Sequence, residues 1–282
     1  MNGQIVRIIS DLYTVKIDNM LYGCRARGVF RNKGITPLVG DNCIVDTDKN
    51  IIVKILDRKN ELKRPPIANV DYALIITSVK EPNLDLNLLD KLISIITYNN
   101  IEPVIVFTKL DLLTEEETNI INDLREYYEL IGIKTFYNTE TNNILKFIKS
   151  KVIVLSGQSG AGKSSLINRM NNTFDIKTDE ISKALGRGKH TTRHVELYSY
   201  KNSFIVDTPG FSSLDIVEEE KGNIRFYFPE FDNDGCKFRD CKHINEIGCK
   251  IKEDVDNNII LKSRYDNYKK MVMGDENFNI NN

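Results

Sequence analysis

The sequence lacks a long apolar run. Its longest apolar stretches, such as residues 73–76, are far too short to span a bilayer, and residues 1–7 do not have the apolar core of a signal peptide. We therefore expect a cytoplasmic protein with no membrane partner.

The sequence also lacks a disulfide framework. It has five cysteines, an odd number, and three of them fall between residues 236 and 249. This spacing suits a reducing compartment and a metal site better than paired cysteines. A chain of 282 residues with 41% hydrophobic residues can form two or three domains, each with its own core.

The net charge of the chain is also close to zero. The 39 basic and 40 acidic side chains give −1, which by itself indicates no polyanionic partner. The charge is unevenly distributed, however, because it is +5 over residues 1–66, −6 over 67–220 and 0 over 221–282. A basic N-terminal segment is one of the compositional signs of a nucleic-acid contact.

Short apolar segments separated by turn residues predict an N-terminal all-β domain. The expected strands are residues 5–9, 13–17, 21–26, 43–45 and 51–55, a spacing that favours a small OB-like barrel over a sandwich. Basic side chains cluster around the loop after the third strand, namely Arg25, Arg27, Arg31 and Lys33. They form either a solvated loop or a contact to a phosphate backbone.

The segment Arg64-Pro65-Pro66 predicts a stiff linker, because proline cannot donate to a ladder and extends the residue before it. We place a domain boundary after residue 66. Apolar strands then alternate with helices, which indicates a parallel sheet covered on both faces. The expected strands are 73–77, 104–107, 134–137, 152–155 and 204–206, with helices over 86–98, 114–130 and 144–148.

A phosphate loop follows the expected strand at 152–155. Residues 157–164 have the complete G-x-x-x-x-G-K-S pattern, and a helix comes next. In such a loop the backbone N–H groups and the helix dipole hold phosphates, Lys163 neutralises the β- and γ-phosphates, and Ser164 ligates Mg²⁺. A chance glycine-rich turn is the alternative. The expected nucleotide-binding residues here are Gly157, Gln158, Ser159, Gly160, Ala161, Gly162, Lys163, Ser164 and Ser165.

A second phosphate-sensing segment, Asp207-Thr208-Pro209-Gly210, ends the expected strand at 204–206. Asp207 can reach Mg²⁺ through water, and Gly210 can come close enough to the γ-phosphate for its N–H to donate. Alone, these four residues would predict only a turn. Their position after an apolar strand favours the nucleotide interpretation.

The third segment, Thr108-Lys109-Leu110-Asp111, directly follows the expected strand at 104–107. The Asp111 carboxylate could accept hydrogen bonds from the guanine ring N–H and exocyclic amine, a donor pair that adenine lacks. The stem of Lys109 could pack along the base. The alternative is a strand-end turn that caps the helix at Thr114. With the phosphate loop, these residues predict a guanine-nucleotide site.

The order of these segments is unusual. In ordinary small GTPases the T/N-K-x-D follows the phosphate loop and the D-x-x-G, whereas here it precedes both. A circular permutation explains this order, because one sheet can be assembled from strands that are connected differently.

A basic segment, residues 186–194, lies between the phosphate loop and Asp207. It suits a loop that closes over the γ-phosphate, with Thr192, or less favourably Thr191, giving Mg²⁺ its second hydroxyl. Phe211 stands where a Ras-type enzyme has its water-orienting Gln. We hypothesise that His190 takes this catalytic role, with His194 the weaker candidate and a simple contact to phosphate or solvent the alternative.

The last motif contains three cysteines and one histidine, in the pattern Cys236-x4-Cys241-x-His243-x5-Cys249. Three thiolates and one imidazole within 14 residues match a closed structural Zn²⁺ site, and free buried cysteines are the alternative. Basic residues are interleaved with these ligands. We expect a helix over 259–273 and a frayed tail over 274–282.

Together these motifs resemble the ribosome small-subunit-dependent GTPase A family of circularly permuted GTPases, over nearly the whole chain. The resemblance implies a multidomain fold: an OB-fold RNA-binding domain (1–66), a circularly permuted α/β P-loop GTPase domain (67–220) and a mainly helical zinc-binding domain (221–282). Where a Ser-Ala-Lys-like guanine loop is expected, this chain has Tyr137-Asn138-Thr139-Glu140.

The resemblance also implies a function. It predicts a GTP-hydrolysing factor that binds the small (30S) ribosomal subunit and its rRNA, assists late maturation and is stimulated by the subunit. The implied cofactors are GTP or GDP, Mg²⁺ and one structural Zn²⁺, and we expect a monomer. A nucleotide-gated RNA-binding module is the second interpretation, favoured by Phe211. A small-molecule kinase would not explain residues 108–111.

Overall fold

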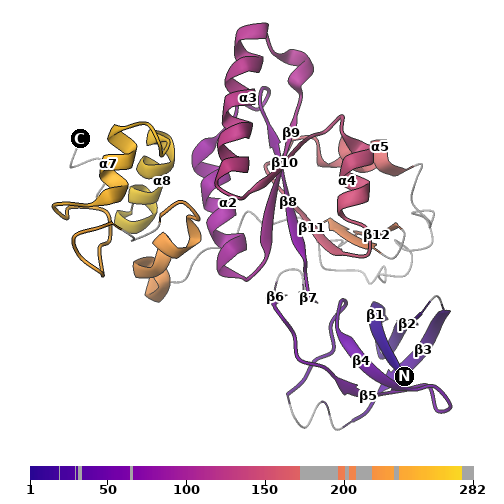
Figure 1. Cartoon of the computed structure of the whole chain (residues 1–282). Helices are drawn as coiled ribbons and strands as arrows, with labels where there is room; N and C mark the ends of the chain where they lie inside the picture. Colours follow the sequence, from indigo (N-terminus) through magenta and orange to yellow (C-terminus); the bar gives the residue numbers. More distant parts are fainter. Residues whose placement is uncertain are drawn as a thin grey trace.

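The computed structural model describes residues 1–18, 20–28, 30, 34–63, 66–171, 196–200, 203–207, 218–231 and 235–274. Figure 1 shows three parts, which are an N-terminal β-barrel, a central sheet with helices on both faces, and a C-terminal helical unit. None of the helices in the described part of the chain combines the length and the apolar character needed to span a bilayer.

The first part is a closed barrel of five strands, as predicted. The strands are β1 (Asn2–Ile9), β2 (Leu12–Ile17), β3 (Met20–Ala26), β4 (Asn42–Asp46) and β5 (Ile51–Ile55), in the order β1-β2-β3-β5-β4. Alternate side chains point inward, so that Ile5, Val15 and Ile52 are fully buried. Cys24 and Cys43 also lie in this core, far in sequence from the other cysteines.

A short ribbon joins the barrel to the central sheet. Strands β6 (Glu61–Lys63) and β7 (Pro66–Ala68) pair antiparallel, so Pro66 begins a strand; Arg64 and Pro65 lie outside the described residues. The ribbon packs on the barrel, because the Ala68 N–H donates to the Val39 carbonyl at 2.9 Å. Gly40 has φ +90°, and a Cβ there would lie 2.0 Å from the Ala68 carbonyl oxygen, so only glycine permits this contact.

The central sheet has six strands in the order β10-β9-β8-β11-β13-β12. Five of them run parallel, as predicted: β8 (Tyr72–Ser78), β9 (Glu102–Thr108), β10 (Lys134–Tyr137), β11 (Val152–Ser156) and β13 (Ser203–Asp207). Strand β12 (Glu196–Tyr200) pairs antiparallel with β13 at the edge. The parallel strands are rich in buried aliphatic residues because both faces are covered.

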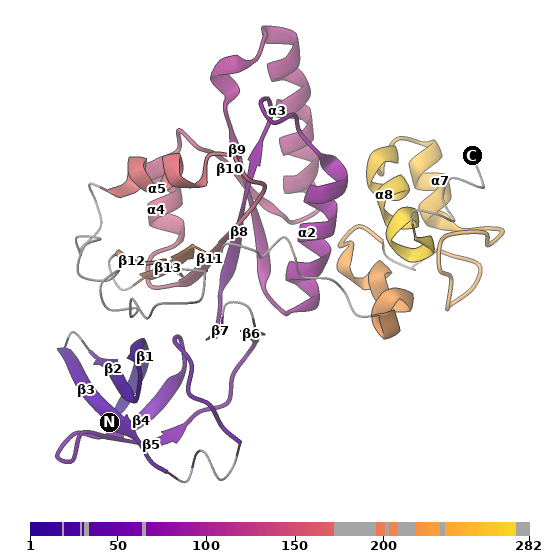
Figure 2. The same ribbon diagram turned by 180° about the vertical axis from the view of Figure 1, so that it is seen from behind.

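The helices divide between the two faces of the sheet (Figures 1 and 2). Helices α2 (Leu86–Tyr98) and α3 (Glu115–Leu130) cover the face with Ala73 and Ile75, whereas α4 (Thr141–Phe147) and α5 (Lys163–Asn171) cover the face with Leu74 and Ile76. Thr114 caps α3 in a capping box with Glu117, and Asp85 caps α2 through the Leu88 N–H.

The barrel is fixed at the edge where the parallel strands begin. The Asn60 amide donates to the Asn100 carbonyl at 2.8 Å just before β9, and Lys59 pairs with Asp71 at 2.7 Å just before β8. The opposite edge, where the strands end, stays clear of these contacts. The carboxyl ends of the strands are the edge where open α/β sheets bind ligands.

The C-terminal part contains the 3₁₀ segment η3 (Glu218–Tyr227), α7 (Lys250–Asp256) and α8 (Lys262–Met273). The helix expected over 259–273 therefore begins at Lys262, and a short helix precedes it. In both views α8 lies beside α2, and α7 lies farther from α2 (Figures 1 and 2). The mainly helical character of this part is confirmed.

A buried charge network joins α8 to α2. The Arg264 guanidinium, 1% exposed, contacts Asp90 and Glu230 at 2.7 Å each. Asp90, fully buried, also accepts hydrogen bonds from Asn267 at 2.7 Å and from the Tyr128 hydroxyl at 2.9 Å. Buried charges are tolerated only when they are paired in this way, so the network fixes how α8 sits on α2.

We predict that Arg264→Leu detaches the C-terminal part. Removing the cation leaves two buried carboxylates without their partner, which costs about 3–5 kcal/mol of local stability. Native-state hydrogen exchange followed by mass spectrometry should show faster exchange in residues 218–274. Lys262→Leu is the control, because its ion pair with Asp266 is exposed and contributes about 0–1 kcal/mol. Wild-type exchange rates in Arg264→Leu would contradict this role.

Candidate functional site

The connections of the sheet reverse direction at β8. From β8 the chain passes to β9 and β10 on one side, and then crosses to β11 and β13 on the other. Since these strands are parallel, their last residues, among them Thr108, Ser156 and Asp207, lie at the same edge. Such a reversal point is where open α/β sheets bind ligands.

The predicted phosphate loop lies at this reversal point, between β11 and α5. Gly157 has φ +131°, and a Cβ there would lie 2.1 Å from the Ile76 carbonyl oxygen on β8. Gly160 and Gly162 also have positive φ. Glycine is therefore needed for the loop to turn tightly and to press against β8. This geometry is that of the strand, loop and helix expected from the sequence.

Polar groups of the loop gather at the start of α5, whose first residue is Lys163. The Lys163 ammonium donates to the carbonyls of Gly157 at 2.8 Å and Gln158 at 3.0 Å. Ser164 and Ser165 are exposed in the first turn. The arrangement brings an ammonium, hydroxyls and the N–H groups of a helix N-terminus together, which suits a phosphate with its metal ion.

The predicted base-reading residues contact the same loop. Thr108 is buried, and its hydroxyl donates to the Ala161 carbonyl at 2.6 Å. Lys109 has φ +63°, and its ammonium donates to the Glu81 carbonyl. Asp111 lies exposed in the 3₁₀ turn η1 (Leu110–Leu112). The strand-end turn of the alternative interpretation is present as η1, and the cap of α3 is formed by Thr114 and Glu117, without Asp111.

The segment Tyr137-Asn138-Thr139-Glu140 lies beside the base-reading residues. The Asn138 N–H donates to the Phe107 carbonyl at 2.9 Å, which sets it next to Thr108. The Glu140 carboxylate accepts from the Tyr137 N–H at 2.6 Å and pairs with Arg125 at 3.2 Å. Glu140 is thus held within its own turn, and Thr139 is the exposed residue of this segment.

Several predicted site residues lie outside the described part of the chain. These are the catalytic candidate His190, the magnesium candidates Thr191 and Thr192, and Gly210. For Asp207 the backbone alone is described. It pairs with Leu155 of β11, so it lies at the end of the sheet where the phosphate loop begins.

The predicted metal ligands come together in the C-terminal part. The ligand atoms of Cys236, Cys241, His243 and Cys249 all lie within 4.8 Å of one another. The His243 Nδ1 is 3.4 Å from the Cys249 Sγ and 3.7 Å from the Cys236 Sγ. A tetrahedral ion with bonds of about 2.0–2.3 Å to such atoms requires separations of this size.

The surroundings of this cluster also fit a structural cation. Burial raises the pKa of the Cys241 thiol to about 12 and raises that of Cys249 in the same direction, so a cation is what would favour their thiolates. Burial lowers the pKa of His243, which favours the neutral imidazole that binds metal. The Lys250 N–H donates to the Cys236 Sγ at 3.3 Å, and the Tyr265 hydroxyl donates to the His243 carbonyl at 2.8 Å. Zn²⁺ fits this donor set.

Two structural features near these sites were not predicted. One is the segment at Glu81 and Pro82, which contacts Lys109 and lies 3.8 Å from the Cβ position of Gly160. The other is the Asp90–Arg264 pair. The signal for the second was an aspartate within the apolar stripe of the helix at 86–98, where a charge needs a partner.

Two family models match the chain. The model of the RsgA GTPase family matches residues 55–217, and that of the RsgA N-terminal domain matches residues 2–51. The small ribosomal subunit biogenesis GTPase RsgA of Enterococcus faecalis is 42% identical over 285 residues, covering 98% of this chain and 96% of the relative. The protein of the same name from Halalkalibacterium halodurans is 44% identical over 276 residues, 94% of each chain.

Solved structures agree in fold. YloQ, a circularly permuted GTPase, has a TM-score of 0.81 at 33% identity and covers 96% of this chain and 93% of its own. YjeQ from Thermotoga maritima has a TM-score of 0.81 at 31% identity and covers 97% and 98%. The matches extend over barrel, sheet and C-terminal part, in the segment order that indicated a permutation. The chain therefore belongs to the RsgA family of circularly permuted GTPases.

Proposed function

We propose that this GTPase acts in the maturation of the small ribosomal subunit and that the subunit stimulates its GTP hydrolysis. The observation that carries the proposal is the extent of the similarity. Relatives named small ribosomal subunit biogenesis GTPase align with 98% and 94% of the chain, so all three parts are shared with them. Such a role would place the protein in the cytoplasm, and we propose that it acts as a monomer.

In this proposal the nucleotide lies across the carboxyl ends of β8, β9 and β11. The loop amides and Lys163 would hold the phosphates, and Ser164 and Thr192 would ligate Mg²⁺. Asp207 and Gly210 would sense the γ-phosphate. His190 would orient the attacking water, because Phe211 has no group that can do so.

Asp111 would select the base. Its carboxylate is exposed, one turn beyond the residue that hydrogen-bonds the phosphate loop, so a base held there would be close to the phosphates. Two charge-assisted hydrogen bonds to the guanine edge would be lost with adenine. The chemistry of the side chain supports this proposal, because an ionised carboxylate offers acceptors and no donor.

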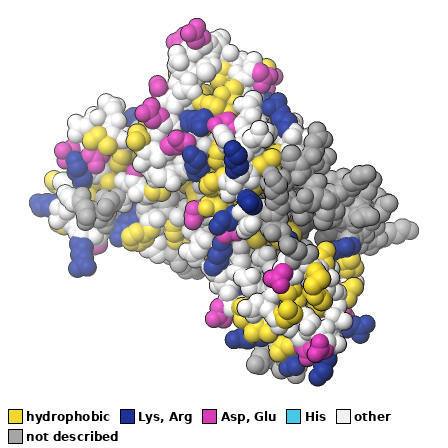
Figure 3. Space-filling view, turned by 45° about the vertical axis from the view of Figure 1, so that its right-hand side comes forward, with side chains coloured by type: hydrophobic (Ala, Val, Ile, Leu, Met, Phe, Trp, Pro, Cys, Tyr) yellow, Lys and Arg dark blue, Asp and Glu magenta, His cyan; other side chains and the backbone are white. Residues whose placement is uncertain are grey.

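The two flanking parts would contact rRNA, and Figure 3 shows Lys and Arg side chains on the surface of both. Arg25 and Arg27 are exposed at the end of β3, and Lys237, Arg239 and Lys242 are interleaved with the metal ligands. Basic side chains of this kind bind phosphate backbones in a salt-dependent way. The domains in this proposal remain residues 1–66, 67–220 and 221–282, and one Zn²⁺ would hold the last of them together.

Asp111→Asn should change the base preference. The amide offers a donor where guanine also has one, so we expect GTP affinity to fall at least about a hundredfold. Xanthosine triphosphate has a carbonyl in place of the guanine amine and should bind the variant better than it binds the wild type. Titration with fluorescent nucleotide analogues measures both changes. Asp123→Asn, an exposed position on α3, is the matched control. Unchanged GTP affinity in Asp111→Asn would exclude this role.

GTP turnover should rise many-fold when purified small ribosomal subunits are added, and the stimulated rate should fall as salt is raised. The rate without subunits should change little with salt. A rate that subunits do not change would overturn the proposed function and favour a nucleotide-gated RNA-binding module.

In the same assay His190→Ala should lose stimulated turnover, with His194→Ala as the control. Stimulation unchanged in His190→Ala would remove His190 from catalysis.

Metal analysis should find one Zn²⁺ per chain, lost in Cys241→Ala. Structural zinc contributes directly to folding, so strong chelators should speed hydrogen exchange in residues 235–274 and Zn²⁺, not Mg²⁺, should reverse the effect. Cys24→Ala is the control, because Cys24 is buried in the barrel; this variant should still contain one Zn²⁺ per chain. Full zinc content in Cys241→Ala would contradict the assignment.

A further inference from the structure

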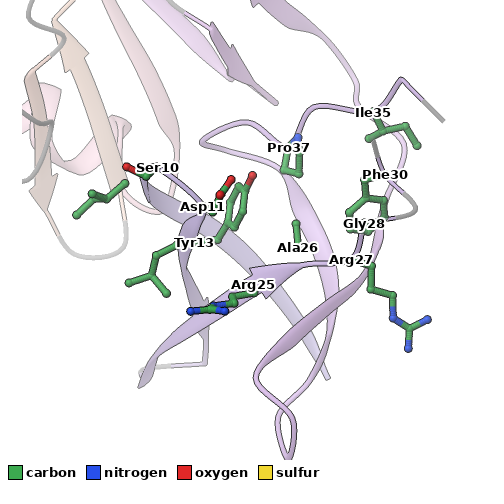
Figure 4. A pocket seen from close by; sticks show the side chains of 12 residues that line it. Ser10, Asp11, Tyr13, Arg25, Ala26, Arg27, Gly28, Phe30, Ile35 and Pro37 are labelled. Atoms are coloured by element: carbon green, nitrogen blue, oxygen red, sulfur yellow. The ribbon is translucent and has the colours of Figure 1, made fainter. Parts of the chain in front are cut away.

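A pocket on the barrel lies apart from the nucleotide and metal sites. Its volume is about 600 Å³, within the range of small-ligand pockets. It lies between the turn that joins β1 to β2, residues 9–13, and the end of β3 with the residues that follow, 25–28 and Phe30. Ile35 closes the side opposite Tyr13, and Pro37 lies between the two (Figure 4).

The walls of the pocket are apolar and its rim is charged. Figure 4 shows Tyr13 on one side, Phe30 and Ile35 on the opposite side, and Ala26 and Pro37 between them. Phe30 is only 5% exposed and belongs to the barrel core, so the wall opposite Tyr13 is backed by that core. A slot with an aromatic ring on one side and an apolar wall of Phe30 and Ile35 on the other accepts a flat ring.

The rim carries both signs of charge in separate places. Arg25 and Arg27 are exposed at the end of β3, and in Figure 4 the Arg27 guanidinium points outward from the rim. Asp11 lies on the side of Tyr13 and is the acidic residue lining the pocket. A phosphate is therefore favoured at the arginines and disfavoured beside Asp11.

A flat ring with a phosphate attached describes a nucleotide. Free nucleoside triphosphates do not fit well, because Gly28 is the one glycine among the residues that line the pocket, and these residues form no glycine-rich phosphate loop. A double helix does not fit either, since its bases are stacked and paired. In OB-type barrels the face of the second and third strands, with the first loop, is where oligonucleotides bind.

We propose that this pocket holds one unpaired nucleotide of an RNA strand, with its base against Tyr13 and its flanking phosphates at Arg25 and Arg27. The proposal rests on the proposed function, since the RNA would be that of the small subunit. It goes beyond a simple phosphate contact. Arginines alone would bind single strands and duplexes alike, whereas a base slot requires an unpaired base.

The absence of tryptophan allows a direct test. Tyr13→Trp gives the full chain a sole tryptophan in the pocket. Its fluorescence should be quenched in a saturable way by a single-stranded RNA of about ten nucleotides, the site size of such barrels, and not by a duplex of the same length. Tyr22→Trp is the matched control, because Tyr22 is half-buried on β3 and does not line the pocket. Equal quenching by the duplex would overturn the proposal.

The second test measures the affinity of each variant for the single-stranded RNA by fluorescence anisotropy. Tyr13→Ala and Arg27→Ala should each bind the single strand about tenfold more weakly. Tyr13→Phe, which keeps the ring, should bind as the wild type does. Lys54→Ala, an exposed basic position of β5 outside the pocket, should lose much less. GTP turnover without subunits should be unchanged in all four variants. Wild-type affinity in Tyr13→Ala would also overturn the proposal.

The two proposals fail in different ways. If subunits do not stimulate the wild type but single strands quench Tyr13→Trp selectively, the proposed function is wrong and the pocket assignment stands. If subunits stimulate the wild type and Tyr13→Ala still binds single strands with full affinity, the pocket assignment is wrong and the proposed function stands.

Discussion

The close approach of Gly157 to the Ile76 carbonyl is the constraint on which the nucleotide site depends. Only a residue without a Cβ lets β11 end beside β8 and turn at once into the loop. That turn fixes the residue at which α5 begins. The hydrogen bond from the Thr108 hydroxyl to the Ala161 carbonyl then holds the end of β9 against the same loop. The ends of three strands are thereby held as one surface.

Features that depend on local patterns could be predicted from the sequence. The barrel strands, the parallel strands and α2 and α3 follow from alternation, apolar runs and capping residues, and the metal ligands follow from their spacing. The segment order indicated the permutation, which the structural relatives bear out. In each case the signal lies within a few residues of the feature, so no knowledge of the tertiary contacts was needed.

Features that depend on distant partners could not be predicted. Asp90 and Arg264 are 174 residues apart, and the sequence around either residue does not identify the other as its partner. The ribbon of β6 and β7 was hidden by its prolines, which also fit a linker. The barrel pocket brings together a turn, a strand end and Pro37, and only closure of the barrel makes them neighbours. Tertiary packing decided all three.

The two flanking parts are held to the central sheet by different means. The barrel is joined at the starts of the strands, and within it the fully buried Asp41 binds Arg58 in a bidentate pair that secures the exit from β5. The C-terminal part is joined to α2 by buried charges. The N-terminal turn of α2, at Asp85 and Leu88, borders the phosphate loop at Gln158. Separating a buried pair costs several kcal/mol, so the C-terminal helices and α2 form one body that reaches the nucleotide site directly, whereas the barrel meets the sheet at its opposite edge.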